Sequence, residues 1–152
     1  MNFLNASDQR DLDHHHFMRA QLVFFLLGAI DGHAKNFSVR LFPTGFRLAP
    51  IYDVISILPA LSRRQVEPKN ARLAMSAGDR KHDRLREIQL RHWEQTSRRA
   101  GFPLKELHLL IEDLVERGGK IETLVDRIGK KLSQKLVDSI VIGVGKQLKM
   151  FV

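Results

Sequence analysis

Residues 28–36 read GAIDGHAKN and mark the point at which a long apolar run gives way to charged and polar side chains. The run before this stretch, residues 17–30, is interrupted only at Arg19, Gln21 and Gly28. It is too short to cross a bilayer and too long for a typical strand, so it predicts a buried helix. The polar residues at its end are therefore expected at the edge of the core, held by a rigid element as a catalytic or binding loop must be.

The composition predicts one ordinary globular domain spanning residues 1–152, with 43% apolar residues. The absence of cysteine excludes disulfides and thiolate metal sites and is compatible with a reducing cytoplasm. Because no signal peptide or membrane-spanning segment is visible, we expect a soluble cytoplasmic protein with no membrane partner. The net charge of +8 indicates an anionic partner, although a solvated basic surface explains it equally well.

The segment before the apolar run is expected to open the same helix, with Ser7 or Asp8 as its N-cap. Three consecutive histidines follow at positions 14–16. Adjacent helical residues project about 100° apart, so these rings cannot converge on one metal ion. We interpret them as the polar beginning of the buried helix.

A β-hairpin is predicted directly after the polar loop. Residues 37–42 alternate between apolar and polar, Pro43-Thr44-Gly45 supplies a turn, and residues 46–49 resume the alternation. Pro50 stops the second strand, and Asp53 follows it. Because a hairpin returns the chain to its starting point, Asp31 and Asp53 can come to the same edge of the structure.

The remaining chain is expected to be mainly helical, which gives a mainly α (α+β) fold: a helical bundle with a short β-hairpin carrying the active-site loop. Between the hairpin and the helical part we expect a short helix or turn over 54–61, an exposed loop over 62–70, a short strand over 71–76 and a charged turn over 78–84. The expected helices are 85–100 or its second half, 104 to the Gly118-Gly119 pair, 121–132, and 133–148 with Ser133 as N-cap.

The polar residues of the loop and the hairpin's end form a set suited to phosphoryl transfer. Oxygen ligands with a single nearby histidine, His33, favour Mg²⁺ over zinc. Phosphoryl transfer requires a group that orients the acceptor hydroxyl, ligands that hold Mg²⁺ on the nucleotide phosphates, and cations that offset the transferred charge. Asp31 could serve as the first and Asn36 with Asp53 as the second. Lys35 or His33 could serve as the third.

The order of these residues repeats the arrangement of protein kinases, in which a catalytic-loop Asp precedes a metal-binding Asn by five residues and a further metal-binding Asp follows. Each residue also has a purely structural interpretation. Asp31 and Asn36 could form a helix-terminal turn with an Asx cap, and Asp53 could cap the short helix that follows it.

The stretches LGAIDGHAKNFS (27–38) and LAPIYDVIS (48–56) resemble the catalytic region of the HipA family of bacterial serine/threonine kinase toxins. The resemblance continues through residues 73–75 and 91–93. It implies a protein-kinase-like C-terminal lobe in which Asp31 is the catalytic base toward a protein serine or threonine. It also implies Asn36 and Asp53 as Mg²⁺ ligands and Tyr52 as a wall of the adenine pocket.

The resemblance further implies Mg²⁺ and ATP as cofactors, a protein substrate of the translation machinery, and a helix-turn-helix antitoxin through which DNA is reached indirectly. Residues 1–152 are expected to lack the N-terminal nucleotide-binding lobe, so the isolated chain is expected not to transfer phosphate. The alternative is a non-catalytic remnant that acts as a binding module for the antitoxin or for the antitoxin–DNA complex.

Overall fold

A computed structural model of the chain describes residues 1–128 and 133–151. The helices are α1 (Arg10–Leu27), α2 (Leu58–Ser62), α3 (Leu90–Ala100), α4 (Leu104–Gly119), α5 (Ile121–Ile128) and α6 (Gln134–Leu148). The strands form two antiparallel pairs, β1 (Val39–Phe42) with β2 (Gly45–Leu48) and β3 (Arg72–Ala77) with β4 (His82–Arg84). Short 3-10 helices are η1 (Asn2–Ala6), η2 (Ala34–Asn36), η3 (Pro68–Asn70), η4 (Leu85–Glu87) and η5 (Lys149–Phe151). The expected mainly α fold is confirmed.

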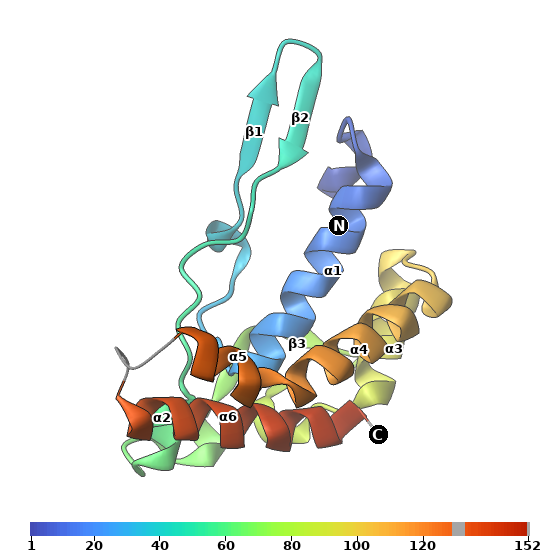
Figure 1. The fold of residues 1–152 in the computed structure, drawn as a ribbon. Coiled ribbons are helices and arrows are strands. Elements are labelled where there is room, and N and C mark those ends of the chain that lie inside the picture. The colour runs from blue at the N-terminus through green and yellow to red at the C-terminus, as the bar shows by residue number, and fades with distance from the viewer. Residues whose placement is uncertain (129–132, 152) are drawn as a thin grey trace.

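The core is built around α1, as its continuous apolar run predicts. Met18, Leu22 and Phe25 of this helix are at most 1% exposed. The Phe25 ring packs against Trp93 of α3 and Phe151 of η5, with ring centroids 5.7 and 5.5 Å apart. Figure 1 shows α1 running from the level of the hairpin into the helical body, while β1 and β2 project away from that body. Helix α1 therefore joins the hairpin to the core.

The C-terminal end of α1 lies three residues earlier than the predicted helix 17–30. Gly28 adopts a left-handed conformation with φ of 59°, and its N–H donates to the carbonyl of Phe25 at 3.1 Å. The N–H of Ala29 donates to the carbonyl of Phe24 at 2.7 Å. Because glycine adopts this conformation at no steric cost, it stops the helix although the apolar run continues through Ile30.

The prediction that Ser7 or Asp8 caps α1 is wrong. The N-cap is Gln9, and the Ser7 and Asp8 groups bind elsewhere. The Ser7 hydroxyl donates to Asp13 Oδ2 at 2.5 Å, and the Asp8 N–H donates to the Phe46 carbonyl at 3.0 Å. Ser7 and Asp8 thus form hydrogen bonds with Asp13 and with the hairpin instead of capping α1, and the Asp8 bond attaches the hairpin to the start of this helix.

Both strand pairs are short. The hairpin prediction is confirmed, with Val39 opposite Leu48 and Phe42 opposite Gly45. The predicted strand over 71–76 is also confirmed, one residue displaced. The predicted charged turn over 78–84 is correct only in part, because residues 82–84 form β4 and pair with β3.

The helices of the C-terminal half follow the predicted order. Of the two alternatives for 85–100, the helix in the second half of this range is confirmed as α3. The first residues form η4, and Gln89 caps α3 in a reciprocal capping box with His92. Helix α5 ends at Ile128, and residues 129–132 of the predicted helix lie outside the described residues. Ser133 is the N-cap of α6 as predicted, although its side chain makes no capping hydrogen bond. Within the described residues, no helix has both the length and the apolarity that crossing a membrane requires.

Candidate functional site

The polar loop that follows α1 is fixed to three neighbouring elements. The Gly28 carbonyl accepts from the N–H groups of Ile30 and Ile57, both at 3.0 Å. The Ile30 carbonyl accepts from the N–H of Ala74 in β3, also at 3.0 Å. The loop is thus held by α1, by the segment that leads into α2, and by β3. Such anchoring keeps the side chains that follow in one arrangement.

Gly32 brings the loop backbone directly onto the core. A Cβ atom at this position would lie 2.3 Å from Cδ2 of Phe24, well inside contact distance. Since the Phe24 ring is only 3% exposed, it has little room to move away. Glycine is therefore required here for close approach, and it positions the neighbouring Asp31 and His33.

Asp31 and His33 lie together at the surface. The Asp31 side chain is 78% exposed, and its Oδ1 lies 3.4 Å from Nε2 of His33. The other ring nitrogen of His33, Nδ1, is buried without a hydrogen-bond partner. Asp31 is thus accessible to an incoming hydroxyl group, while His33 flanks it from the protein side.

Asn36 ends the loop as the last residue of η2 and is buried, with 7% of its surface exposed. Its backbone N–H donates to the His33 carbonyl at 2.9 Å. Its side-chain Oδ1 is buried and has no hydrogen-bond partner. Buried polar atoms in native proteins are nearly always paired with a protein group, an ordered water or an ion, so this oxygen is free to accept a further partner.

The hairpin brings the segment containing Asp53 back to the loop. At its base, the Ala49 N–H donates to the Ser38 carbonyl at 2.9 Å. Further on, the Tyr52 hydroxyl lies 3.4 Å from the Lys35 carbonyl. Tyr52, which precedes Asp53, therefore contacts Lys35, which precedes Asn36.

Asp53 itself has a left-handed backbone, with φ of 55°. Aspartate is among the few non-glycine residues that enter this region regularly. Conformations of this kind concentrate at functional sites. The backbone geometry of Asp53 gives a reason, independent of spacing, to include its exposed carboxylate in the candidate site.

The oxygen donors of this region suit a metal ion that takes few protein ligands, such as Mg²⁺, better than an ion whose ligands are all protein side chains. Among the residues described, no group of three or more His, Asp or Glu side chains could hold an ion. Mg²⁺ needs fewer protein ligands, since it commonly keeps waters and binds one or two carboxylates together with substrate phosphates. The unpaired oxygen of Asn36 and the carboxylate of Asp53 are donors of this type.

A cavity of about 440 Å³ lies between α1 and the base of the hairpin. Its apolar walls include Val23, Leu48 and Ile51, and its cations include Arg19 and Arg40. The sequence interpretation missed both arginines. Arg40 appeared only as a polar position in an alternating strand, and Arg19 as a polar interruption in the apolar run.

The fold and the loop define a class of protein. It is a mainly helical lobe in which an anchored polar loop follows the central helix, and a β-hairpin leads from this loop to a second acidic residue, Asp53. The family model described as "HipA-like C-terminal domain" matches residues 1–121, and the chain belongs to this family. The expected family membership is confirmed. Helix α6 lies outside the matched residues.

The fold is also similar to that of a chain in a solved structure from Shewanella oneidensis MR-1. That structure is described as the toxin-antitoxin system HipA, HipB and its operator DNA complex. The TM-score is 0.71 at 18% sequence identity, and the match covers 97% of the present chain. The present chain spans about a third, 33%, of the length of the Shewanella chain.

Proposed function

We propose that this chain is the catalytic C-terminal lobe of a HipA-like, Mg-ATP-dependent serine/threonine protein kinase toxin. The observation that carries the proposal is the buried, unpaired Oδ1 of Asn36. Leaving a buried polar atom unpaired costs on the order of 1–3 kcal/mol. A metal ion bound with the nucleotide would offset that cost, which accounts for an amide at a position that an apolar side chain could fill.

In the proposed site, each residue has a separate role. Asp31 accepts the proton of the attacking serine or threonine hydroxyl, and its exposure leaves it open to a protein substrate. Asn36 and Asp53 hold Mg²⁺, which when bound neutralises charge on the nucleotide phosphates. His33 and Lys35 supply nearby groups that offset charge on the transferred phosphoryl oxygens.

The nucleotide base would lie against Tyr52, which directly follows Ile51, a lining residue of the cavity between α1 and the hairpin. The size of this cavity, about 440 Å³, is within the range of small-ligand sites. Val23 and Ile51 give it apolar walls, and Arg40 brings positive charge to it. Arg19 also lines it but is paired with Asp113 at 2.6 Å. These features suit an aromatic ring that is attached to phosphates.

The partners we propose follow from the family. The similar Shewanella structure contains HipA, HipB and operator DNA. By analogy, a helix-turn-helix antitoxin would bind the present chain, DNA would be reached only through that antitoxin, and the protein substrate would belong to the translation machinery. The net charge of +8 is compatible with approach to nucleic-acid-containing complexes.

Phosphate transfer by these residues is proposed to require a complementary nucleotide-binding lobe. Kinases cover the phosphates with a glycine-rich loop and a lysine that stand on such a lobe. Residues 1–152 correspond to about a third of the similar Shewanella chain. That fraction also supports a second candidate, a non-catalytic module that binds the antitoxin.

The test is a calorimetric titration of Mg-ATP into the 152-residue chain, alone and mixed with a candidate N-terminal lobe from a HipA-like protein. We expect weak or undetectable binding to the chain alone, and both tight binding and transfer of labelled phosphate in the mixture. Asn36→Leu should weaken the Mg²⁺-dependent binding, whereas Asn5→Leu, at an exposed position of η1, should not. Absence of Mg-ATP binding in the mixture, with antitoxin binding retained, would favour the non-catalytic module.

A further inference from the structure

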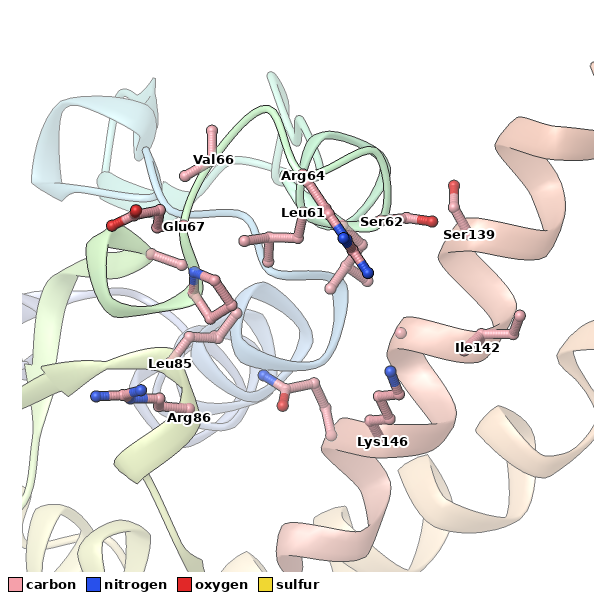
Figure 2. Close-up of a pocket in the computed structure, with 15 residues that line it drawn as sticks. Leu61, Ser62, Arg64, Val66, Glu67, Leu85, Arg86, Ser139, Ile142 and Lys146 are labelled. Atoms are coloured by element: carbon pink, nitrogen blue, oxygen red, sulfur yellow. The ribbon is translucent and has the colours of Figure 1, made fainter.

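A second cavity, of about 770 Å³, lies between α6 and the segment formed by α2 and the loop that follows it. Figure 2 shows Leu61, Ser62 and Arg64 on one side of this cavity and Ser139, Ile142 and Lys146 of α6 on the other. It is separate from the polar loop and from the cavity beneath the hairpin, because it shares no lining residue with either.

Two cations project into this cavity from opposite walls. The side chains of Arg64 and Lys146 point into the same gap (Figure 2). Neither forms an ion pair with the side chains that the structure describes. The one acidic residue of the lining, Glu67, pairs with Lys69 at 2.7 Å. A third cation of the lining, Arg86, lies 3.8 Å from Glu87. Among the residues that the structure describes, Arg64 and Lys146 are thus the lining cations without an ion-pair partner.

The backbone at Arg64 helps to hold its side chain at the cavity. Arg64 has a left-handed conformation with φ of 57°. Its N–H donates to the Leu61 carbonyl at 3.1 Å, and the N–H of Gln65 donates to the Ala60 carbonyl at 2.9 Å. Arginine seldom adopts this conformation, so these two bonds at the end of α2 maintain an uncommon local geometry.

The rest of the lining is largely apolar. Leu58, Leu61 and Leu85 contribute to the walls, and Ile142 lies on α6 with 59% of its surface exposed. The volume is within the range of cavities that bind small organic ligands. Arg64 and Lys146 are exposed residues of this lining. Cations beside apolar walls are the features that recognise an acidic group attached to an apolar body.

We propose that this cavity binds a small organic anion carrying one carboxylate or phosphate group on an apolar body. The Arg64 guanidinium can bind such a group through two parallel hydrogen bonds, and Lys146 adds a point charge from the facing helix. The apolar body lies against Leu58, Leu61 and Ile142.

The first test uses the fluorescence of anilinonaphthalene sulfonate, an aromatic anion with an apolar body, on the 152-residue chain. We expect saturable binding at one site and displacement by octanoate. Neutral octanol and inorganic phosphate should each displace the probe far less effectively, because each lacks one half of the proposed ligand. Displacement by octanol as effective as by octanoate would overturn the proposal, as would the absence of saturable binding.

The second test removes each cation separately. Arg64→Asn removes the charge while retaining a residue that tolerates positive φ, and Lys146→Gln removes the charge on α6. Each variant should bind octanoate about tenfold more weakly, the effect of losing one charge-assisted contact. The matched control is Arg98→Gln at an exposed position of α3, which should leave the affinity unchanged.

Urea denaturation of the same variants establishes that each is folded, and removal of one of two facing like charges should not reduce stability. Ile142→Asp gives an independent check at an exposed position, because it introduces a negative charge at the cavity and should weaken octanoate binding. Undiminished octanoate affinity in the folded Arg64→Asn and Lys146→Gln proteins would overturn the proposal.

Discussion

Oδ2 of Asp13, on the first turns of α1, accepts a hydrogen bond from the backbone N–H of Leu48 in β2 at 2.7 Å. The same oxygen accepts the Ser7 hydroxyl at 2.5 Å, and Asp13 is only 2% exposed. The hydrogen bond between Leu48 and Asp13 joins residues 35 positions apart and attaches the hairpin to the central helix. Since the hairpin leads to Tyr52 and Asp53, this contact determines where the second half of the candidate site lies.

Asp13→Ala is expected to lower the free energy of unfolding by about 1–3 kcal/mol, because it removes the charged acceptor of two half-buried donors, the Ser7 hydroxyl and the Leu48 N–H. The amide hydrogen of Leu48 should also exchange faster. Urea denaturation and hydrogen exchange followed by NMR measure the two effects. Asp11→Ala, at an exposed position of the same helix, is the control and should cost less than about 1 kcal/mol. Unchanged protection of Leu48 in Asp13→Ala would contradict the anchoring role.

Gly32→Ala is expected to lower the free energy of unfolding by about 1–3 kcal/mol, since the added methyl group would overlap the buried Phe24 ring. Gly145→Ala in α6 is the matched control, because no atom lies within 4 Å of the added Cβ. The control should raise stability by about 0.5–1 kcal/mol, as alanine favours a helix interior. Thermal denaturation of both variants measures the difference. Equal stabilities would show that the loop does not pack on Phe24.

The hairpin and the order of the site residues could be predicted from the sequence because both depend on local patterns. Alternation and turn residues locate β1 and β2, and the spacing from Asp31 to Asn36 is visible directly. The role of Asp13 could not be predicted in this way. Its partner Leu48 belongs to a different element, and nothing in the surrounding residues distinguishes Asp13 from Asp11 as an acid in the first turns of a helix.

Other features depended on packing that the sequence pattern does not contain. Strand β4 consists of His82, Asp83 and Arg84, which have no apolar alternation, and it is extended because β3 pairs with it. The cavity between Arg64 and Lys146 exists only because α6 packs near α2, far away along the chain. Gly28 ended α1 inside an apolar run, where hydrophobicity alone predicts that the helix continues.

Stability is expected to decrease as the pH falls below about 6.5 because of His92. Burial of its ring, with smaller contributions from His82 and Arg91, holds the pKa of His92 below its usual value of 6.5. The unfolded chain therefore takes up a proton at a higher pH than the folded chain does. The free energy of unfolding is fully retained above about pH 6.5 and falls with pH until the folded pKa is passed. Burial likewise lowers the pKa of His14 and of His15, which act in the same direction.

His92→Gln should reduce this pH dependence. Glutamine can accept the Gln89 N–H in place of Nδ1 of His92, which lies 3.1 Å from that nitrogen, so the capping box is retained. At pH 8, His92 is neutral in both the folded and the unfolded chain. The variant should then lose only the packing of the His92 ring, which stacks on His82 with ring centroids 3.9 Å apart. Urea denaturation between pH 5 and 8 measures the slope. An unaltered slope would remove His92 from the set of responsible groups.

Asn36→Leu and Asp53→Ala should separate stability from ligand binding. Replacing the unpaired Oδ1 of Asn36 by an apolar group should leave thermal stability unchanged or raise the free energy of unfolding by about 1 kcal/mol. Both substitutions should weaken Mg-nucleotide binding to the chain assembled with a complementary lobe. Calorimetry with and without Mg²⁺ measures the loss. Full Mg²⁺-dependent affinity in Asp53→Ala would exclude its carboxylate as a ligand.

Asp31→Ala should abolish phosphate transfer by the assembled protein without unfolding the lobe. The side chain is 78% exposed and its charged neighbour is His33 at 3.4 Å, so the fold loses little when the carboxylate is removed. Loss of a positioned base typically reduces the rate about 10²–10⁴-fold, while nucleotide binding should persist because Asn36 and Asp53 remain. Transfer of labelled phosphate to a serine-containing protein measures the first effect, and Mg-ATP calorimetry measures the second. Asp79→Ala, at an exposed position beside β3, controls for the loss of a surface charge. Transfer at the original rate in Asp31→Ala would assign the base to another residue.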